Sequence, residues 1–215
     1  MNTFVKLLLL CTLSLGHVVN QAHATLISMD SAFGSDTITL DTETGLRWLD
    51  VTLSTDYSYL GVLSELGDGG AFDGFRVATR DEVSTLFTNA DIPTINTSFV
   101  EENYAPVLSL MNFVGITGHN GNLGTGIPFD YTAGHAYDPT PPNDGWVWIP
   151  NLGAYEPDAT ARASIYSYVP VDNVNNTHGT WLVGITSVPE PATLTLLGYG
   201  LIALGFGKKK KQYTC

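Results

Sequence analysis

Histidine and cysteine are the side chains that most often bind transition metals, and those in this chain follow no recognisable pattern. The histidines beyond the N-terminal leader are His119, His135 and His178. Their spacing fits neither a His-Glu-x-x-His helix nor a Cys-x-x-Cys site, so no transition-metal centre is predicted. The two cysteines are Cys11, in the leader, and Cys215, the last residue. The chain between them therefore has no thiol nucleophile and no disulfide.

Carboxylates are abundant, with 21 Asp and Glu against 9 Lys and Arg and a formal net charge of −12. This balance argues against a nucleic-acid partner, because phosphates are bound by clustered Lys and Arg. A glycosidase needs only two carboxylates at a suitable separation. So many acidic residues make such pairs common by chance, and hydrolysis is therefore the least favoured activity.

An acidic segment rich in glycine and proline contains the candidates for a calcium site. Calcium prefers oxygen ligands, and four side chains here offer them: Asp130, Asp138, Asn143 and Asp144. Neither an EF-hand nor a nonapeptide spacing is present, so a solvated acidic loop is the favoured interpretation. We predict no cofactor, with calcium as the alternative.

Trp146 and Trp148 are the candidates for glycan binding, since indole rings contact the apolar faces of sugars. On a strand, residues two apart point to the same side, and Val147 would point to the other. Packing in a core explains the pattern equally well. Further aromatic candidates stand elsewhere in the chain: Tyr131, Tyr137, Tyr155 and Trp181.

Short apolar and β-branched runs predict strands at residues 37–40, 46–50, 74–78, 146–149, 163–169 and 180–185. The first two runs flank a loop that ends in Gly45, which predicts a β-hairpin. Residues 115–145 are rich in Gly, Asn, Asp and Pro and have no apolar period. We expect one long irregular loop there, a kind of segment that is usually functional or mobile.

Two or three helices are predicted between these strands. The first covers residues 57–66, and its apolar face would consist of Leu60, Leu63 and Leu66. The second begins at a capping box, in which the Thr79 hydroxyl and the Glu82 carboxylate each accept a backbone N–H.

A second capping box, from Ser98 to Glu101, predicts another helix. Its apolar face would consist of Tyr104, Leu108 and Met111. Pro106 is expected to bend or shorten it, because proline removes a backbone donor.

Two stretches resemble the signature of C-type-lectin-like domains in bacterial surface proteins: residues 44–50 (TGLRWLD), and residues 74–79 (GFRVAT) followed by Glu82. The resemblance implies an α+β fold: a single C-type-lectin-like domain with a mostly antiparallel sheet, two or three helices and a long irregular loop. It also implies that the first and last strands pair, which would bring Trp48 and Trp181 into one sheet. The chain departs from the pattern in lacking the cysteines and the Trp-Asn-Asp calcium–sugar motif.

The first 24 residues have the three parts of a secretory signal peptide. Lys6 is the positive residue, residues 7–15 are the apolar stretch, and Ala22 and Ala24 are the small residues before the cut. Residues 25–187 then form the expected exported globular domain. It is free of lysine and contains every acidic residue except Glu190, so we expect a soluble acidic body.

Residues 188–211 form a second tripartite pattern. The motif consists of Val188, Pro189, Glu190 and Pro191. Residues 192–207 follow without a charge, and the pattern ends in a basic stop: Lys208, Lys209, Lys210 and Lys211. Sixteen helical residues reach only about 24 Å, short of the ~30 Å hydrocarbon layer, which favours transient membrane insertion. The lysines are expected to stay cytoplasmic, with residues 25–187 across the inner membrane.

This combination resembles the PEP-CTERM sorting signal of Gram-negative bacteria. The resemblance implies processing near the Pro-Glu-Pro motif by an exosortase, an integral-membrane enzyme, and an association with exopolysaccharide and biofilm. The prolines beside Glu190 favour an extended backbone that an enzyme can reach. An ordinary C-terminal membrane anchor is the alternative. The chain departs from the usual pattern in having lysine where arginine is commoner, and in residues 212–215 beyond the basic cluster.

The predicted function is that of a non-enzymatic exported protein of the envelope or extracellular matrix, with the secretion machinery and an exosortase as partners. It would cross the inner membrane, be anchored there transiently, and end on the outer surface or outside the cell. The alternative is a lectin-like module that binds exopolysaccharide. A polysaccharide hydrolase is the third hypothesis.

Overall fold

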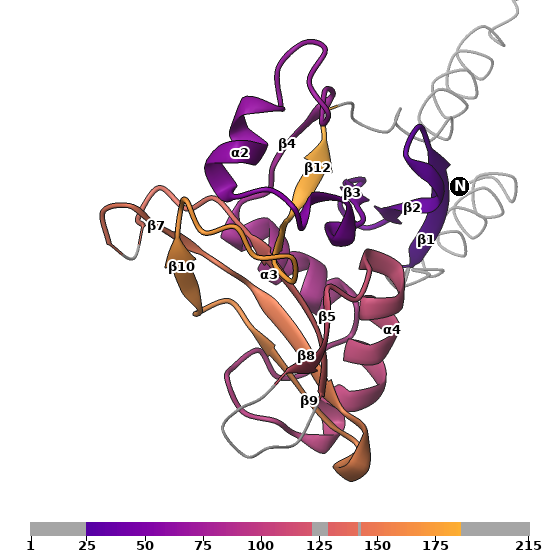
Figure 1. Ribbon diagram of the computed structural model, residues 1–215. Helices are drawn as coiled ribbons and strands as arrows, with labels where there is room; N and C mark the ends of the chain where they lie inside the picture. The colour runs from indigo at the N-terminus through magenta and orange to yellow at the C-terminus, as the bar shows by residue number, and fades with distance from the viewer. Residues whose placement is uncertain (1–24, 122–128, 142, 186–215) are drawn as a thin grey trace, which may run out of the picture.

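The computed structural model describes residues 25–121, 129–141 and 143–185 (Figure 1). The fold is α+β, as predicted, with three α-helices and mostly antiparallel sheets among these residues. No helix in the described part is long and apolar enough to span a membrane. The predicted signal peptide and the tripartite tail lie outside the described residues.

The first sheet has the strand order β1-β2-β3-β12-β4. Its strands are β1 (Leu26–Ser31), β2 (Gly34–Asp41), β3 (Arg47–Leu49), β12 (Leu182–Gly184) and β4 (Phe75–Val77). The predicted hairpin is β2–β3, and β3 pairs through Trp48 with Val183 of β12. The sequence did not indicate β1, because its side chains are exposed or only partly buried and show no clear apolar alternation.

The last strand, β12, is an interior strand of this sheet. Val183 of β12 pairs with Trp48 on one side and with Arg76 of β4 on the other. Trp181 directly precedes β12, and its ring meets that of Trp48 edge to face at 6.1 Å. The two rings thus meet, but Trp181 itself lies between β11 and β12 and not on a strand. The expected pairing of the first and last strands is wrong, because β12 pairs with β3 and β4, whereas β1 pairs only with β2.

The second sheet corrects the prediction of a long irregular loop at residues 115–145. Its order is β11-β6-β8-β9, and β5 also pairs with β6. The strands are β5 (Gly118–Gly121), β6 (Phe129–His135), β8 (Asn151–Tyr155), β9 (Thr160–Ser164) and β11 (Gly179–Thr180). β5 and β6 both fall within the supposed loop. β6 consists largely of small and polar residues, and pairing on both sides makes it a strand where local composition does not.

A two-stranded ribbon of β7 (Trp146–Trp148) and β10 (Tyr168–Pro170) forms the third sheet. β7 confirms the strand predicted at residues 146–149. The run predicted at residues 163–169 is divided between β9 and β10, and the run at 180–185 between β11 and β12.

The α-helices are α2 (Tyr59–Ser64), α3 (Arg80–Asn89) and α4 (Tyr104–Val114), and short 3-10 turns cover Val51–Ser54, Glu101–Asn103 and Glu156–Asp158. The capping box of α3 is confirmed, since the Thr79 hydroxyl accepts the Glu82 N–H at 3.1 Å and Glu82 accepts the Thr79 N–H at 2.8 Å. The leucine face of α2 was wrong. Leu60 and Leu63 are 51% and 42% exposed, and this short helix buries Val62 instead.

The second capping box was also wrong. The Ser98 N–H donates to the Asn96 side chain, and a 3-10 turn precedes α4, so the helix begins later than expected. Pro106 stands in the first turn of α4, where its missing N–H costs no helical bond, and the helix continues to Val114. Its buried face consists of Val107, Leu110, Met111 and Val114, whereas Tyr104 and Leu108 are only partly buried.

Removing the last strand tests its place in the fold. A chain truncated after Val169 loses β12 and the fully buried Trp181, whose loss alone costs about 3–5 kcal/mol of a total stability of about 5–15 kcal/mol. We expect no cooperative thermal transition by circular dichroism. A chain truncated after Ile185 keeps β12 and should melt cooperatively. Cooperative melting of both truncations would show that the fold does not need β12.

The buried His135 makes stability depend on pH. Burial, with a smaller effect of nearby His178, lowers the pKa of His135 from 6.5 to about 4. Between these values the unfolded chain binds more protons, so stability is full above pH 6.5 and falls toward pH 4, by up to about 3 kcal/mol. In denaturant titrations, His135→Gln should reduce this pH dependence. Equal pH dependence of the wild type and His135→Gln would contradict the assignment.

Candidate functional site

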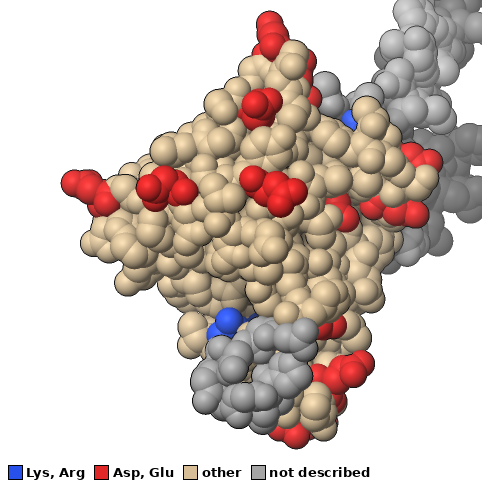
Figure 2. Space-filling model, viewed as in Figure 1, with Lys and Arg blue, Asp and Glu red and all other residues tan. Residues whose placement is uncertain are grey.

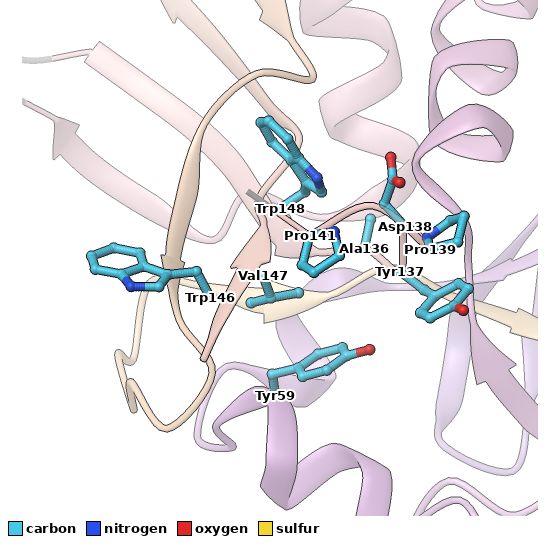
Figure 3. Close-up of a pocket in the computed structure, with 9 residues that line it drawn as sticks. All are labelled: Tyr59, Ala136, Tyr137, Asp138, Pro139, Pro141, Trp146, Val147 and Trp148. Carbon is cyan, nitrogen blue, oxygen red and sulfur yellow. The ribbon is translucent and has the colours of Figure 1, made fainter. Parts of the chain in front are cut away.

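A cleft of about 250 Å³ lies where three segments of the chain meet (Figure 3). Tyr59 comes from α2, residues 136–139 and 141 come from the segment after β6, and the third wall is β7. The sequence predicted Trp146, Trp148 and Asp138 as separate candidates, for glycan and for calcium. The structure brings all three to this one cleft.

Backbone hydrogen bonds hold the cleft walls together. The Tyr137 N–H donates to the Ala78 carbonyl at 2.9 Å, and the Arg80 N–H donates to the Tyr137 carbonyl at 2.8 Å. On the other side, the Ala136 N–H donates to the Trp148 carbonyl at 2.9 Å. Residues 136–137 are thus fixed between the start of α3 and β7, so the cleft is preformed.

Trp146 and Trp148 lie on the same side of β7, as their spacing predicts. Both rings contact the Tyr168 ring edge to face, with centroids 5.5 and 5.8 Å apart respectively. Val147, between them, is buried. One aromatic residue of β10 therefore supports both indoles.

The two indoles differ in accessibility. The Trp148 indole N–H donates to the Thr140 carbonyl at 3.1 Å, and the Arg80 guanidinium lies 4.4 Å from the centroid of the Trp148 ring. Trp146 is 37% exposed, and Figure 3 shows its ring directed outward at one end of the cleft. Trp148 is thus a fixed wall, and Trp146 is the indole that an incoming ligand can reach.

Asp138 carries the acidic charge of the cleft, and Arg80 compensates it. The Arg80 Nε atom lies 2.8 Å from Asp138 Oδ2. The contact is an ion pair without hydrogen-bond geometry, because the Arg80 Nε–H has no acceptor among the described residues. The combination of this pair and the indole gives the cleft a polar end and an aromatic wall.

The other calcium candidates have partners or positions of their own. Asp130 pairs with His119, with 2.8 Å between Oδ1 and Nδ1. The Asn143 carbonyl accepts the Trp146 N–H at 3.1 Å, and Asp144 is exposed. Within residues 25–121, 129–141 and 143–185, no three His, Cys, Asp or Glu side chains gather closely enough to hold a metal ion.

Tyr59 is the cleft residue that the sequence did not indicate. It lies on α2, far from the other residues along the chain, and only the tertiary fold brings it to them. Burial, with Tyr137 adding to the effect, raises the pKa of Tyr59, so its hydroxyl remains a hydrogen-bond donor at neutral pH. Of the other aromatic candidates, Tyr137 lines this cleft, whereas Trp181 lies in the core.

The residues predicted for processing lie outside the described part of the chain: Ala22, Ala24, Val188, Pro189, Glu190, Pro191, Lys208, Lys209, Lys210 and Lys211. The described body ends close to the tail. The Ile185 N–H donates to the Gly74 carbonyl at 2.9 Å, and the Ile185 side chain is 62% exposed. The predicted motif thus begins three residues after the last described residue.

Comparison with known proteins identifies this tail. No curated protein and no solved structure matches the chain. Residues 187–210 match a family model of short extent, and they agree within one residue with the tripartite pattern at 188–211. Proteins that carry this motif are exported and sorted to the envelope. The C-terminal tail is a PEP-CTERM protein-sorting motif.

Proposed function

We propose that this chain is a non-enzymatic exported protein of a Gram-negative envelope or extracellular matrix, processed by an exosortase at its Pro-Glu-Pro motif. The match of residues 187–210 to the PEP-CTERM motif carries this proposal. The charge of the body agrees with it. Figure 2 shows carboxylates spread over the visible face and basic side chains at few places, as suits a soluble domain outside the membrane.

The chemistry of the cleft favours binding over hydrolysis. Glycosidases use two carboxylates on either side of the scissile bond. Among the described residues, Asp138 is the one carboxylate that lines the cleft, and Arg80 lies 2.8 Å from it. The described lining of the cleft therefore offers no second carboxylate for such a pair.

The second candidate function is glycan binding in this cleft by a C-type-lectin-like domain. The exposed ring of Trp146 in a cleft that Trp148 also lines favours it, because aromatic faces match the apolar faces of sugars. Tyr59, Tyr137 and Asp138 supply hydroxyl and carboxylate groups for sugar hydroxyls. The ligand would be the exopolysaccharide of the same cell.

Processing is tested by intact mass and fractionation in the native host. The wild-type protein should lack residues 1–24 and everything beyond the Pro-Glu-Pro region. Glu190→Ala should cross the membrane and then accumulate uncut in the inner membrane, because the enzyme no longer recognises its motif. Glu156→Ala, an exposed change in the body, should be processed normally. Mature wild-type protein that still carries Lys208–Lys211 would identify the tail as an ordinary anchor.

Glycan binding is tested by calorimetry with the host's purified exopolysaccharide. Trp146→Ala should weaken binding about 3- to 10-fold, the effect of losing one aromatic contact. Tyr166→Ala removes an aromatic side chain that is 55% exposed and does not line the cleft, and should bind normally. If the wild type does not bind the exopolysaccharide, the glycan-binding function is refuted and the matrix role is the function that stands. Release of shortened glycan would indicate a hydrolase.

A further inference from the structure

A second cavity, of about 310 Å³, lies against the sheet of β6, β8 and β9. The core-facing side of this sheet carries Leu152 and Ala161, which pack in the cluster that includes α4. The register pairs Tyr131 with Gly153, and Gly153 with Arg162, so Tyr131 and Arg162 project from the opposite side. The volume of the cavity is within the range of small-molecule sites, about 300–1,000 Å³.

Three residues around this cavity each carry a buried polar atom that has no hydrogen-bond partner among the described residues. The atoms are Nε of Arg162, Oδ1 of Asn151 and Nδ1 of His178, and all three residues line the cavity. A buried polar atom without a partner is costly, so such atoms are rare and call for an explanation. The presence of three such residues around one cavity of the described structure indicates a polar ligand.

Arg162 defines the charge of that ligand. Among the described residues, Arg76 pairs with Glu82 at 2.6 Å and Arg80 with Asp138 at 2.8 Å, but no carboxylate pairs with Arg162. Its neighbours are two rings, those of Phe99 and Phe129, with centroids 5.4 and 5.7 Å from the guanidinium carbon. A guanidinium group that lines a cavity and has no carboxylate partner in the described part of an acidic domain suits a ligand carboxylate.

Asn151 shows that the ligand must also donate a hydrogen bond. Its Nδ2 group already donates to the Ile149 carbonyl and to the Ser167 hydroxyl, both at 3.0 Å. Oδ1 is therefore left as an acceptor, which a hydroxyl group satisfies and a simple inorganic anion does not. His178, whose pKa is lowered by burial, is neutral at pH 7 and offers a further hydrogen bond to a hydroxyl.

We propose that this cavity binds a sugar acid, with its carboxylate on Arg162, a hydroxyl on Asn151 and its ring against Phe129 and Tyr131. The acidity of the body disfavours densely charged polyanions, so the ligand is a single uronate, either free or as an isolated residue of a polysaccharide. The inference goes beyond the proposed sorting function and does not need the aromatic cleft, since none of these four residues lines that cleft.

The test compares glucuronate with its uncharged methyl ester, by calorimetry on the full chain in detergent micelles. The wild type should bind glucuronate at least tenfold more tightly than the ester. Arg162→Gln should abolish this difference. Arg47→Gln is the matched control, because Arg47 also has a buried Nε without a partner but does not line the cavity, and it should keep the difference. Trp146→Ala should keep it as well, which separates this site from the cleft.

Equal binding of the acid and the ester by the wild type, or an equal loss in Arg47→Gln, would overturn the proposal. If Arg162→Gln does not fold, the site is tested by NMR of the wild type, from the ring ¹⁵N signals of His178. They should shift saturably with glucuronate, and no shift at saturating concentration contradicts the site. An oligosaccharide made of neutral sugars and a single glucuronate identifies the source: tighter binding than free glucuronate indicates a polysaccharide residue, and equal binding indicates the free acid. If neither free glucuronate nor this oligosaccharide binds, the proposal is refuted.

Discussion

Trp181 is the residue on which both large sheets depend, because the chain crosses there from β11 in one sheet to β12 in the other. Its N–H donates to the His135 carbonyl at 2.9 Å, and its carbonyl accepts the Ala78 N–H at 2.8 Å. The indole N–H donates to the Pro150 carbonyl at 3.2 Å, and the ring packs against Trp48. A buried indole with a satisfied N–H gives a large apolar contact without an unpaired donor. The two sheets are therefore joined by one side chain and its backbone.

The aromatic cleft is an extension of the same network. Ala78, which donates to Trp181, accepts the Tyr137 N–H, and Tyr137 accepts the Arg80 N–H. The capping box fixes the start of α3 at this point, and the Glu82 carboxylate also binds Arg76 at 2.6 Å, which lowers the pKa of Glu82. Since Arg80 follows directly on this cap, its side chain reaches both Trp148 and Asp138. The position of the polar end of the cleft thus follows from the core.

Local patterns predicted several elements that local interactions determine, although the Ser98–Glu101 capping box and the leucine face of α2, both local patterns, were wrong. The largest error came where distant residues decide. The β2–β3 hairpin, the α3 cap and the common side of Trp146 and Trp148 depend on residues a few positions apart. β6 reads as a loop because of residues such as Gly134, yet a Cβ there would lie 3.0 Å from the Trp181 ring, so glycine is what allows the strand to pack. The unpaired state of Arg162 is equally invisible in sequence, because it depends on which carboxylates the fold leaves out of reach.

The order of segments along the chain relates the fold to its sorting tail. β12 lies between β3 and β4, so the first sheet is incomplete until residues through Gly184 have joined it. The last backbone bond described is that of the Ile185 N–H to the Gly74 carbonyl, and the matched motif begins at residue 187. The proposed cleavage in the Pro-Glu-Pro region would therefore remove no strand and no core side chain of the described body. Because the last strand ends at Gly184, before the motif begins at residue 187, every strand of the described body lies on residues that the proposed cleavage would leave in place.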